Sequence, residues 1–207
     1  MDTIAHNFVY DPLRQGADAS VWRFYQGQPY QSGQYMAFND ASALMYYDVG
    51  RGLVSFTLNV PHAPQAGDSR QWGISAGGDY ALFSVQGDVF TVTTSCAGVT
   101  TSNTLTWASE WTGNDTVFAI RWEAGGAYFF VNGYKYSIIS DASIPSGSLA
   151  PYVSNHGTDA LLVKKIMGSG LQSLVLNPVI ASGDVTLPYG YADEKMTIAE
   201  SVTVSVT

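Results

Sequence analysis

The sequence predicts an all-β protein, built as a two-sheet antiparallel β-sandwich of the jelly-roll type. Three observations predict this fold class. Segments rich in aromatic and β-branched residues recur about every 8–12 residues, with glycine, proline and asparagine between them. Apolar and polar side chains alternate inside these segments, as they do along a half-buried strand. We find no stretch with the period of about 3.6 residues that marks an amphipathic helix.

The clearest segment is residues 117–139, which is typical of three strands joined by two tight turns. Three apolar residues alternate along its first strand and are expected in the core: Phe118, Ile120 and Trp122. Gly125-Gly126 is expected to close the first hairpin with positive φ angles, and Asn132-Gly133 the second. This segment therefore predicts an antiparallel meander.

The chain before the meander divides into an irregular opening segment and a series of strands. Residues 1–33 are expected to be irregular, with strand-like pieces at Asn7–Tyr10 and Val21–Tyr25. Residues 95–104 are rich in serine, threonine and glycine, which favours a loop or a weak edge strand. The strands expected between these parts are Gln34–Phe38, Ala43–Asp48, Arg51–Val60, Gln71–Ser75, Tyr80–Gln86 and Val89–Thr94.

After the meander we expect two further strands, Ala150–Ser154 and Ala160–Ile166, which complete a sandwich domain over residues 1–180. Residues 181–207 are predicted to form a C-terminal β extension, because apolar and polar residues alternate up to the last residue. Such a strand either completes its own sheet or pairs with a neighbouring subunit. Other protein subunits are therefore expected partners, and the two alternatives stay open.

Composition narrows the classes of function. At 207 residues the chain fits one domain. A net charge of −8 argues against a nucleic-acid partner, because phosphate binding needs clustered lysine and arginine. No apolar run approaches the ~20 residues of a membrane span. Cys96 stands alone, so no internal disulfide is expected, and residues 1–13 lack the features of a signal peptide. We expect a location on a virion, or outside the cell after release.

The order of the expected strands and turns, with the residues at their ends, forms a recognisable pattern. Over residues 33–168 it consists of Gly52–Leu58, Gln71–Ile74, Phe118–Trp122, Tyr128–Gly133, Ile144-Pro145 and Leu161–Val163. In this pattern the chain resembles the concanavalin A-like lectin/glucanase superfamily, and within it the laminin G-like branch. The resemblance implies two stacked sheets, one of them curved, with ligands bound on the concave face or at the rim loops.

Glycoside hydrolysis, an activity of some members of that superfamily, needs two carboxylates that face each other about 5 Å apart for retention and farther apart for inversion. The glucanase members carry them on one strand as E-x-D-x-x-E, and no such triplet occurs here. Glu110 and Glu123 stand apart, and Asp193-Glu194 would point to opposite faces of a strand. No G-x-S-x-G motif occurs either. We therefore expect no catalytic residues and no enzymatic activity.

Two kinds of binding site are candidates. Aromatic rings and polar side chains on two loops are typical of a glycan site: Trp107, Glu110, Trp111, Tyr152, Asn155 and His156. The alternative is that the tryptophans pack in the core. The laminin G-like resemblance implies a calcium ion at the rim, and the expected ligands are Asn114, Asp115 and Asp159. The alternative there is ordinary turn chemistry, in which Asn and Asp bond their own backbone.

Taken together, these features favour a non-enzymatic structural or binding protein. We expect a phage-type decoration or tail-associated protein of a virion surface, with a lectin-like fold that binds glycans. Few charges, a single cysteine and a strand-forming C-terminus favour this hypothesis. The alternatives are a free-standing carbohydrate-binding lectin module and a glycoside hydrolase of the same fold.

Overall fold

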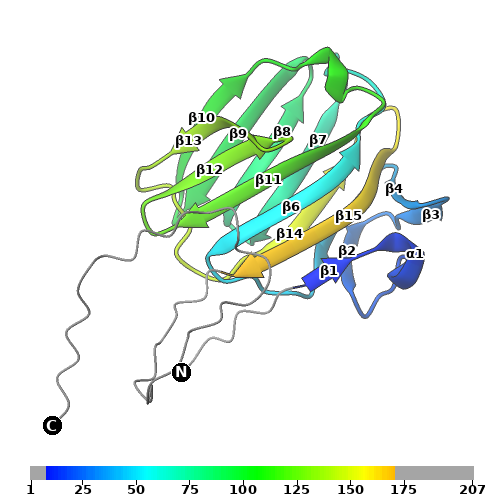
Figure 1. Ribbon diagram of the computed structural model, residues 1–207, viewed down its shortest axis with the longest axis horizontal. Helices are drawn as coiled ribbons and strands as arrows, with labels where there is room; N and C mark the ends of the chain where they lie inside the picture. The colour runs from blue at the N-terminus through cyan, green and yellow to red at the C-terminus, as the bar shows by residue number, and fades with distance from the viewer. Residues whose placement is uncertain (1–7, 171–207) are drawn as a thin grey trace, which may run out of the picture. The chain divides into compact units, whose positions relative to one another are not determined.

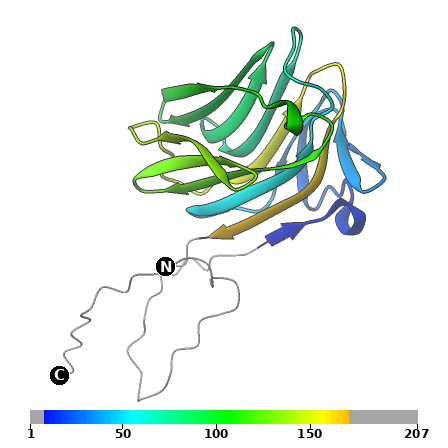
Figure 2. The same ribbon diagram turned by 45° about the horizontal axis from the view of Figure 1, so that its top comes forward.

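The computed structural model describes residues 8–170, which form two stacked antiparallel β-sheets (Figure 1). Figure 2 shows the sheets as two layers, with β8 and β9 in one and β6 and β11 in the other. The predicted fold class, an all-β sandwich of two antiparallel sheets, is confirmed. The predicted C-terminal extension, residues 181–207, lies outside the described residues, as does the expected boundary at residue 180.

The strands of each sheet follow a fixed spatial order. The eight-stranded sheet runs β13 (Tyr134–Ile139), β12 (Gly126–Val131), β11 (Asp115–Glu123), β6 (Gly52–Asn59), β15 (Leu161–Gly170), β4 (Tyr35–Phe38) and β3 (Tyr30–Ser32), and β1 (Phe8–Tyr10) also pairs with β15. The seven-stranded sheet runs β10 (Val99–Leu105), β9 (Val89–Cys96), β8 (Asp79–Gln86), β7 (Ser69–Ala76), β14 (Ala150–Asn155), β5 (Ala41–Met45) and β2 (Trp22–Gln26). Two short helical turns, α1 (Pro12–Gln15) and η1 (Ser109–Trp111), lie in connections.

The meander forms as the alternation predicts. Phe118, Ile120 and Trp122 are fully buried, and β11 pairs with β12 and with β6. Asn132-Gly133 closes the β12–β13 hairpin with φ angles of 49° and 82°, as expected. The first turn differs, because the loop lies between Glu123 and Gly126 and neither Gly125 nor Gly126 has a positive φ. A turn with negative φ angles closes this hairpin, so it does not need glycine.

Aromatic side chains fill the space between the sheets. The ring of Trp72 lies 4.9 Å from that of Phe118 and 5.9 Å from that of Phe83, in edge and stacked arrangements. Such pairs add about 0.5–1.5 kcal/mol each beyond the burial of their area. Trp22 and Trp122 are buried as well, so the prediction that Trp122 belongs to the core is confirmed.

Three small elements were not expected from the sequence: the strand β3 and the one-turn helices α1 and η1. The side chain of Asp11 accepts a hydrogen bond from the backbone N–H of Leu13 at 3.0 Å, and Pro12 occupies the first helical position. Most of the edge strand β10 lies within residues 95–104, which confirms one of the two alternatives for that stretch. Among the described residues, no helix is long and apolar enough to cross a membrane.

Candidate functional site

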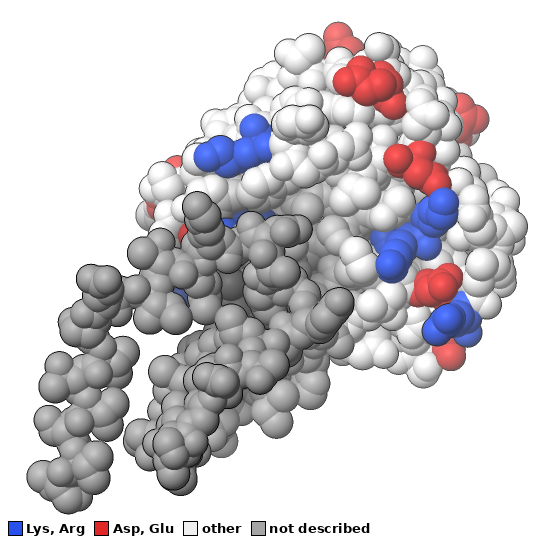
Figure 3. All heavy atoms as spheres, viewed as in Figure 1, with Lys and Arg blue, Asp and Glu red and all other residues white. Residues whose placement is uncertain are grey.

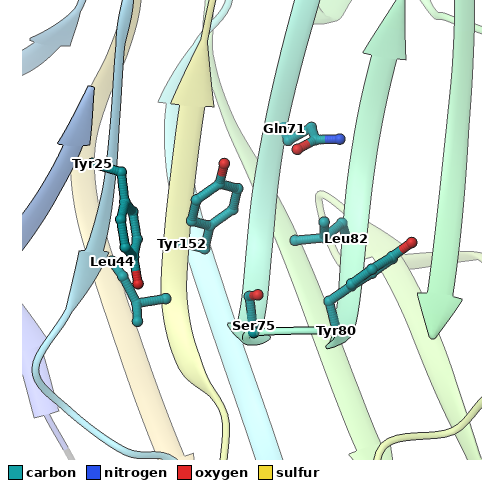
Figure 4. A pocket seen from close by; sticks show the side chains of 8 residues that line it. Tyr25, Leu44, Gln71, Ser75, Tyr80, Leu82 and Tyr152 are labelled. Carbon is teal, nitrogen blue, oxygen red and sulfur yellow. The ribbon is translucent and has the colours of Figure 1, made fainter. Parts of the chain in front are cut away.

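An open hollow of about 420 Å³ lies on the outer face of the seven-stranded sheet (Figure 4). We call it the tyrosine hollow. Its lining residues come from five strands and one turn: Tyr25, Leu44, Gln71, Ser75, Gly77, Tyr80, Leu82 and Tyr152. Figure 4 shows the three tyrosine rings and the Gln71 amide on the same side of the strands.

Strand alternation places these side chains. Along β14, Val153 is buried in the core, so Tyr152 next to it points outward. Tyr152 lies opposite Leu44 of β5 and opposite Gly73 of β7. Tyr80 of β8 lies opposite Ser75 of β7 in the same way. Residues far apart in the sequence therefore meet on one face because β14 lies between β5 and β7.

Tyr25 reaches the hollow through an irregularity in the edge strand β2. The pairing of β2 with β5 shifts register between Phe24 and Gln26, as at a β-bulge, where the extra residue takes a new direction. The guanidinium carbon of Arg23 lies 5.2 Å from the centre of the Tyr25 ring, a cation–π contact. This contact holds the ring at the border of the hollow.

Gly73 keeps the centre of β7 free of a side chain. A Cβ atom at this position would lie 2.3 Å from the carbonyl oxygen of Ala81 and 3.0 Å from the Cδ1 atom of Ile120. The contact with Ala81 is far shorter than real Cβ contacts and involves the backbone of β8, so a larger residue would force the strands β7 and β8 apart. The sheet beside Tyr152 is consequently bare backbone.

The tyrosine hollow is uncharged and offers hydrogen bonds. Its polar groups are three phenol hydroxyls, the amide of Gln71 and the hydroxyl of Ser75. Along the described strands of this sheet, the outward-facing positions include Arg23 but no aspartate or glutamate. Such a surface suits a neutral ligand rich in hydroxyl groups, and it does not contain the pair of carboxylates that glycoside hydrolysis commonly uses.

The predicted glycan residues fall into three separate places. Tyr152 lines the tyrosine hollow, whereas Trp111 is only 2% exposed and belongs to the core. The Trp111 ring packs against Trp107 at 5.4 Å, and the indole N–H of Trp107 donates to the Thr112 hydroxyl at 3.0 Å. Glu110 is exposed on η1. Trp111 therefore packs in the core, as the alternative to a glycan site expects. Its ring presents no surface to a ligand.

Asn155 and His156 belong to a polar network beyond the end of β14. The buried Asn155 amide donates to the carbonyl of Phe38 at 2.7 Å, and its oxygen accepts from Arg70 Nε at 3.2 Å. The buried Asp68 Oδ1 lies 3.1 Å from Arg70 Nη2, without the alignment of a hydrogen bond. Burial lowers the pKa of Arg70, and the charge of Asp68 opposes this shift. His156 Nδ1 lies 2.9 Å from Asp40 Oδ1. These contacts fix loops rather than present groups to a ligand.

The residues expected to hold calcium have other partners. The Asn114 amide donates to the carbonyls of Glu110 and Thr112, which is turn chemistry. Asp115 accepts hydrogen bonds from Lys164 and Tyr35, while Asp159 lies 3.5 Å from His62. Within residues 8–170 no group of three or more histidine, cysteine, aspartate or glutamate side chains is placed to hold a metal ion. The described residues therefore provide no cluster of ligands that supports the expected calcium site.

Sequence reasoning found one residue of the hollow, Tyr152, and missed the others. Tyr80, which precedes the buried Ala81, was a usable signal, because an outward aromatic residue on a strand is a candidate for a binding face. Tyr25 had no such signal, since its direction depends on a register shift against β5.

Comparison with solved structures relates this sandwich to glucan-cleaving enzymes. A prokaryotic β-1,3-1,4-glucanase (lichenase) derived from a mouse hindgut metagenome has a TM-score of 0.63 at 11% identity, over 78% of this chain and 98% of that one. A β-glucanase of Bacillus licheniformis has a TM-score of 0.58 at 10% identity, over 78% and 97%. The laminarinase catalytic domain of Thermotoga maritima has a TM-score of 0.57 at 9% identity, over 75% and 93%.

No protein-family model matches the chain, and no curated protein matches it by sequence. The structural likenesses contradict the expectation of a phage-type virion decoration or tail-associated protein without enzymatic activity, because the neighbours are named as glycoside hydrolases. They do not confirm the laminin G-like branch of the resemblance. The chain has the concanavalin A-like jelly-roll sandwich fold that these glucanases share.

Proposed function

We propose that the protein acts on a neutral β-linked glucan, with the activity of a glycoside hydrolase or transglycosylase. These are the classes for which its structural neighbours are named. The observation that carries the proposal is the tyrosine hollow, an uncharged aromatic depression on a sandwich of the glucanase fold. We infer that the glucan binds there.

The chemistry of the lining suits a sugar chain. The C–H groups on the face of a pyranose ring are apolar and pack against aromatic rings, while its hydroxyl groups form hydrogen bonds at the edge. Tyr80, Tyr152 and Tyr25 supply both kinds of contact, and Gln71 adds a donor and an acceptor. An uncharged hollow avoids the cost of burying an unpaired charge under a neutral ligand.

The direction of the bound chain follows from the sheet. Neighbouring strands lie about 4.8 Å apart, so side chains from adjacent strands repeat at that spacing across the hollow. The lining residues come from the neighbouring strands β2, β5, β14, β7 and β8. An extended polysaccharide that crosses these strands meets a new set of side chains at each step. A long polymer is therefore favoured over a single sugar.

The groups that would cleave the glucan need not be the groups that bind it. Two-carboxylate hydrolysis requires acidic groups about 5 Å apart, or about 6.5–9.5 Å apart in inverting enzymes. Among the described residues, those that line the hollow include no aspartate or glutamate. They account for binding and orientation, and cleavage requires acidic groups contributed from outside the lining.

Electrophoresis of the full chain in gels that contain β-1,3-1,4-glucan or laminarin tests the binding. We expect retardation by glucan, and an affinity about tenfold lower for Tyr152→Ala, equivalent to about 1.4 kcal/mol of lost contact. The matched control is Tyr134→Ala, because Tyr134 is 75% exposed on β13 of the other sheet. Equal weakening by both variants, or no retardation of the wild type, would exclude the tyrosine hollow as the site.

Release of reducing ends from the same polysaccharides tests the cleavage. The proposal predicts that the wild type releases reducing ends, or transfers a labelled glucan to an acceptor. Retardation without either reaction would remove the enzymatic part of the proposal and leave glucan binding in place.

A further inference from the structure

A second hollow, of about 330 Å³, lies on the outer face of the eight-stranded sheet, on the opposite side of the sandwich from the tyrosine hollow. We call it the lysine hollow. It is lined by Asp11, Leu13, Gln34, Thr57, Asp115, Lys164 and Lys165. Figure 3 shows basic and acidic side chains alternating in a band on this side of the molecule. Its volume is at the lower end of the range for small-molecule sites.

A β-bulge in β15 places two consecutive lysines in this hollow. Val163 pairs with Leu58 and Lys165 with Thr57, so Lys164 is the extra residue. Val163 and Ile166, on either side of the lysines, are both fully buried. In a regular strand Lys164 and Lys165 would point to opposite faces, and one ammonium group would enter the core. The bulge turns both side chains outward.

Lys164 is already neutralised by Asp115. Its ammonium group lies 2.5 Å from Asp115 Oδ2, and Tyr35 donates its hydroxyl to the other oxygen of this carboxylate at 2.9 Å. Burial by itself raises the pKa of Asp115, but the hydrogen bonds from Lys164 and Tyr35 outweigh it and lower the pKa below its usual value. The hydrogen bond to Asp115 raises the pKa of Lys164 in turn. This pair contributes no net charge to the hollow.

Asp11, the other acidic residue, is also engaged. Its Oδ1 atom accepts a hydrogen bond from the backbone of Leu13 at 3.0 Å, and its Oδ2 atom lies 3.8 Å from Arg14 Nε. The carboxylate is therefore tied to α1 and balanced by a basic neighbour. Lys165 remains, a half-buried cation for which no ion pair occurs among the described residues. The hollow is lined by two lysines and two aspartates, and among its described residues Lys165 is the ammonium group without an ion pair.

We propose that the lysine hollow binds a single oxyanion group, a carboxylate or a sulfate, through Lys165. Thr57 lies opposite Lys165 in the strand register, and its hydroxyl is a further donor in the lining. Gln34, whose amide donates to the Tyr35 hydroxyl at 3.2 Å, also lines the hollow. An ammonium group and neutral donors form charge-assisted hydrogen bonds with an oxyanion, which are stronger than neutral ones. This site is independent of the proposed glucan activity, since it lies on the other sheet.

Isothermal titration of the full chain with sodium sulfate and with sodium glucuronate tests the site. We expect saturable binding of one anion per chain that weakens with added sodium chloride, because salt screens an exposed charge. Lys165→Gln should raise the dissociation constant at least tenfold, and Lys165→Arg should restore binding. The matched control is Lys135→Gln, an exposed lysine on β13.

The outcomes separate clearly. Tighter binding of glucuronate than of sulfate identifies the anion as part of an acidic sugar, and equal binding identifies a small free oxyanion. Both results support the site. Binding that survives Lys165→Gln, or that Lys135→Gln weakens equally, overturns the proposal. So does the absence of saturable binding of either anion to the wild type.

Discussion

Tyr10 shows how a single buried group affects the stability of the whole molecule. Its ring is fully buried and meets Trp22 edge to face, with centroids 5.1 Å apart. Its hydroxyl donates to the carbonyl of Gly16 at 2.8 Å, which fastens the segment around α1 to the core. Burial raises the pKa of Tyr10 to about 12, because a phenolate could not be hydrated at this position.

This shift predicts a loss of stability in alkali. The protonated phenol is favoured in the folded state, so its contribution is complete below the ordinary pKa of about 10 and is lost as the pH rises toward about 12. We expect the free energy of unfolding to fall across that interval, and Tyr10→Phe to flatten the decline. Urea unfolding at a series of alkaline pH values measures both. An equal decline in the variant would contradict this assignment to Tyr10.

At the scale of elements, the β12–β13 hairpin depends on its turn chemistry. Asn132 and Gly133 both have positive φ angles, and the Asn132 side chain accepts a hydrogen bond from the backbone of Val117 at 2.9 Å. The turn thereby contacts the neighbouring strand β11 as well as closing its own hairpin. The β11–β12 turn has a glycine too, Gly125, but not a positive φ there.

The two turns provide a matched pair of substitutions. Gly133→Ala should lower the free energy of unfolding by about 1 kcal/mol or more, because a side chain at a φ of 82° is strained. Gly125→Ala should be neutral or slightly stabilising, since its φ is not positive and a Cβ atom there meets no atom within 4 Å. Thermal or urea unfolding of both variants provides the comparison. Equal losses would show that backbone strain is not the determinant.

The strand pattern could be predicted because each strand is half buried, and burial on one face leaves an alternation in the sequence. Phe118, Ile120 and Trp122 illustrate this. The helix α1 and the strand β3 are too short for any periodicity to show. The direction of Tyr25 and of the two lysines in β15 depends on register shifts between strands, which only the assembled sheet determines.

The candidate site was harder to predict than the strands. Trp111 looked like a sugar platform because it follows Trp107 in a loop, yet η1 turns its ring into the core. The residues of the tyrosine hollow converge only because β14, seven strands after β7 in the sequence, inserts between β5 and β7. No local pattern in a single sequence indicates the spatial order of these strands.

On the scale of the whole molecule, the two sheets present different chemistry to their surroundings. The outer face of the seven-stranded sheet has an uncharged hollow lined by tyrosine, and that of the eight-stranded sheet has a hollow lined by two lysines. The shared fold of the glucanases does not fix the function, because one fold supports many activities. The proposed function rests on the tyrosine hollow, whose uncharged aromatic lining is suited to a neutral polysaccharide.

The most direct test of this account is an NMR titration of the full chain with a β-1,3-1,4-linked glucan tetrasaccharide. The account predicts saturable shifts of backbone amide signals in β7, β8 and β14, around Tyr152 and Tyr80. It predicts no such shifts in β13, where Tyr134 is exposed on the other sheet. Shifts confined to the eight-stranded sheet, or no shifts at saturating oligosaccharide, would contradict the claim that the tyrosine hollow binds glucan.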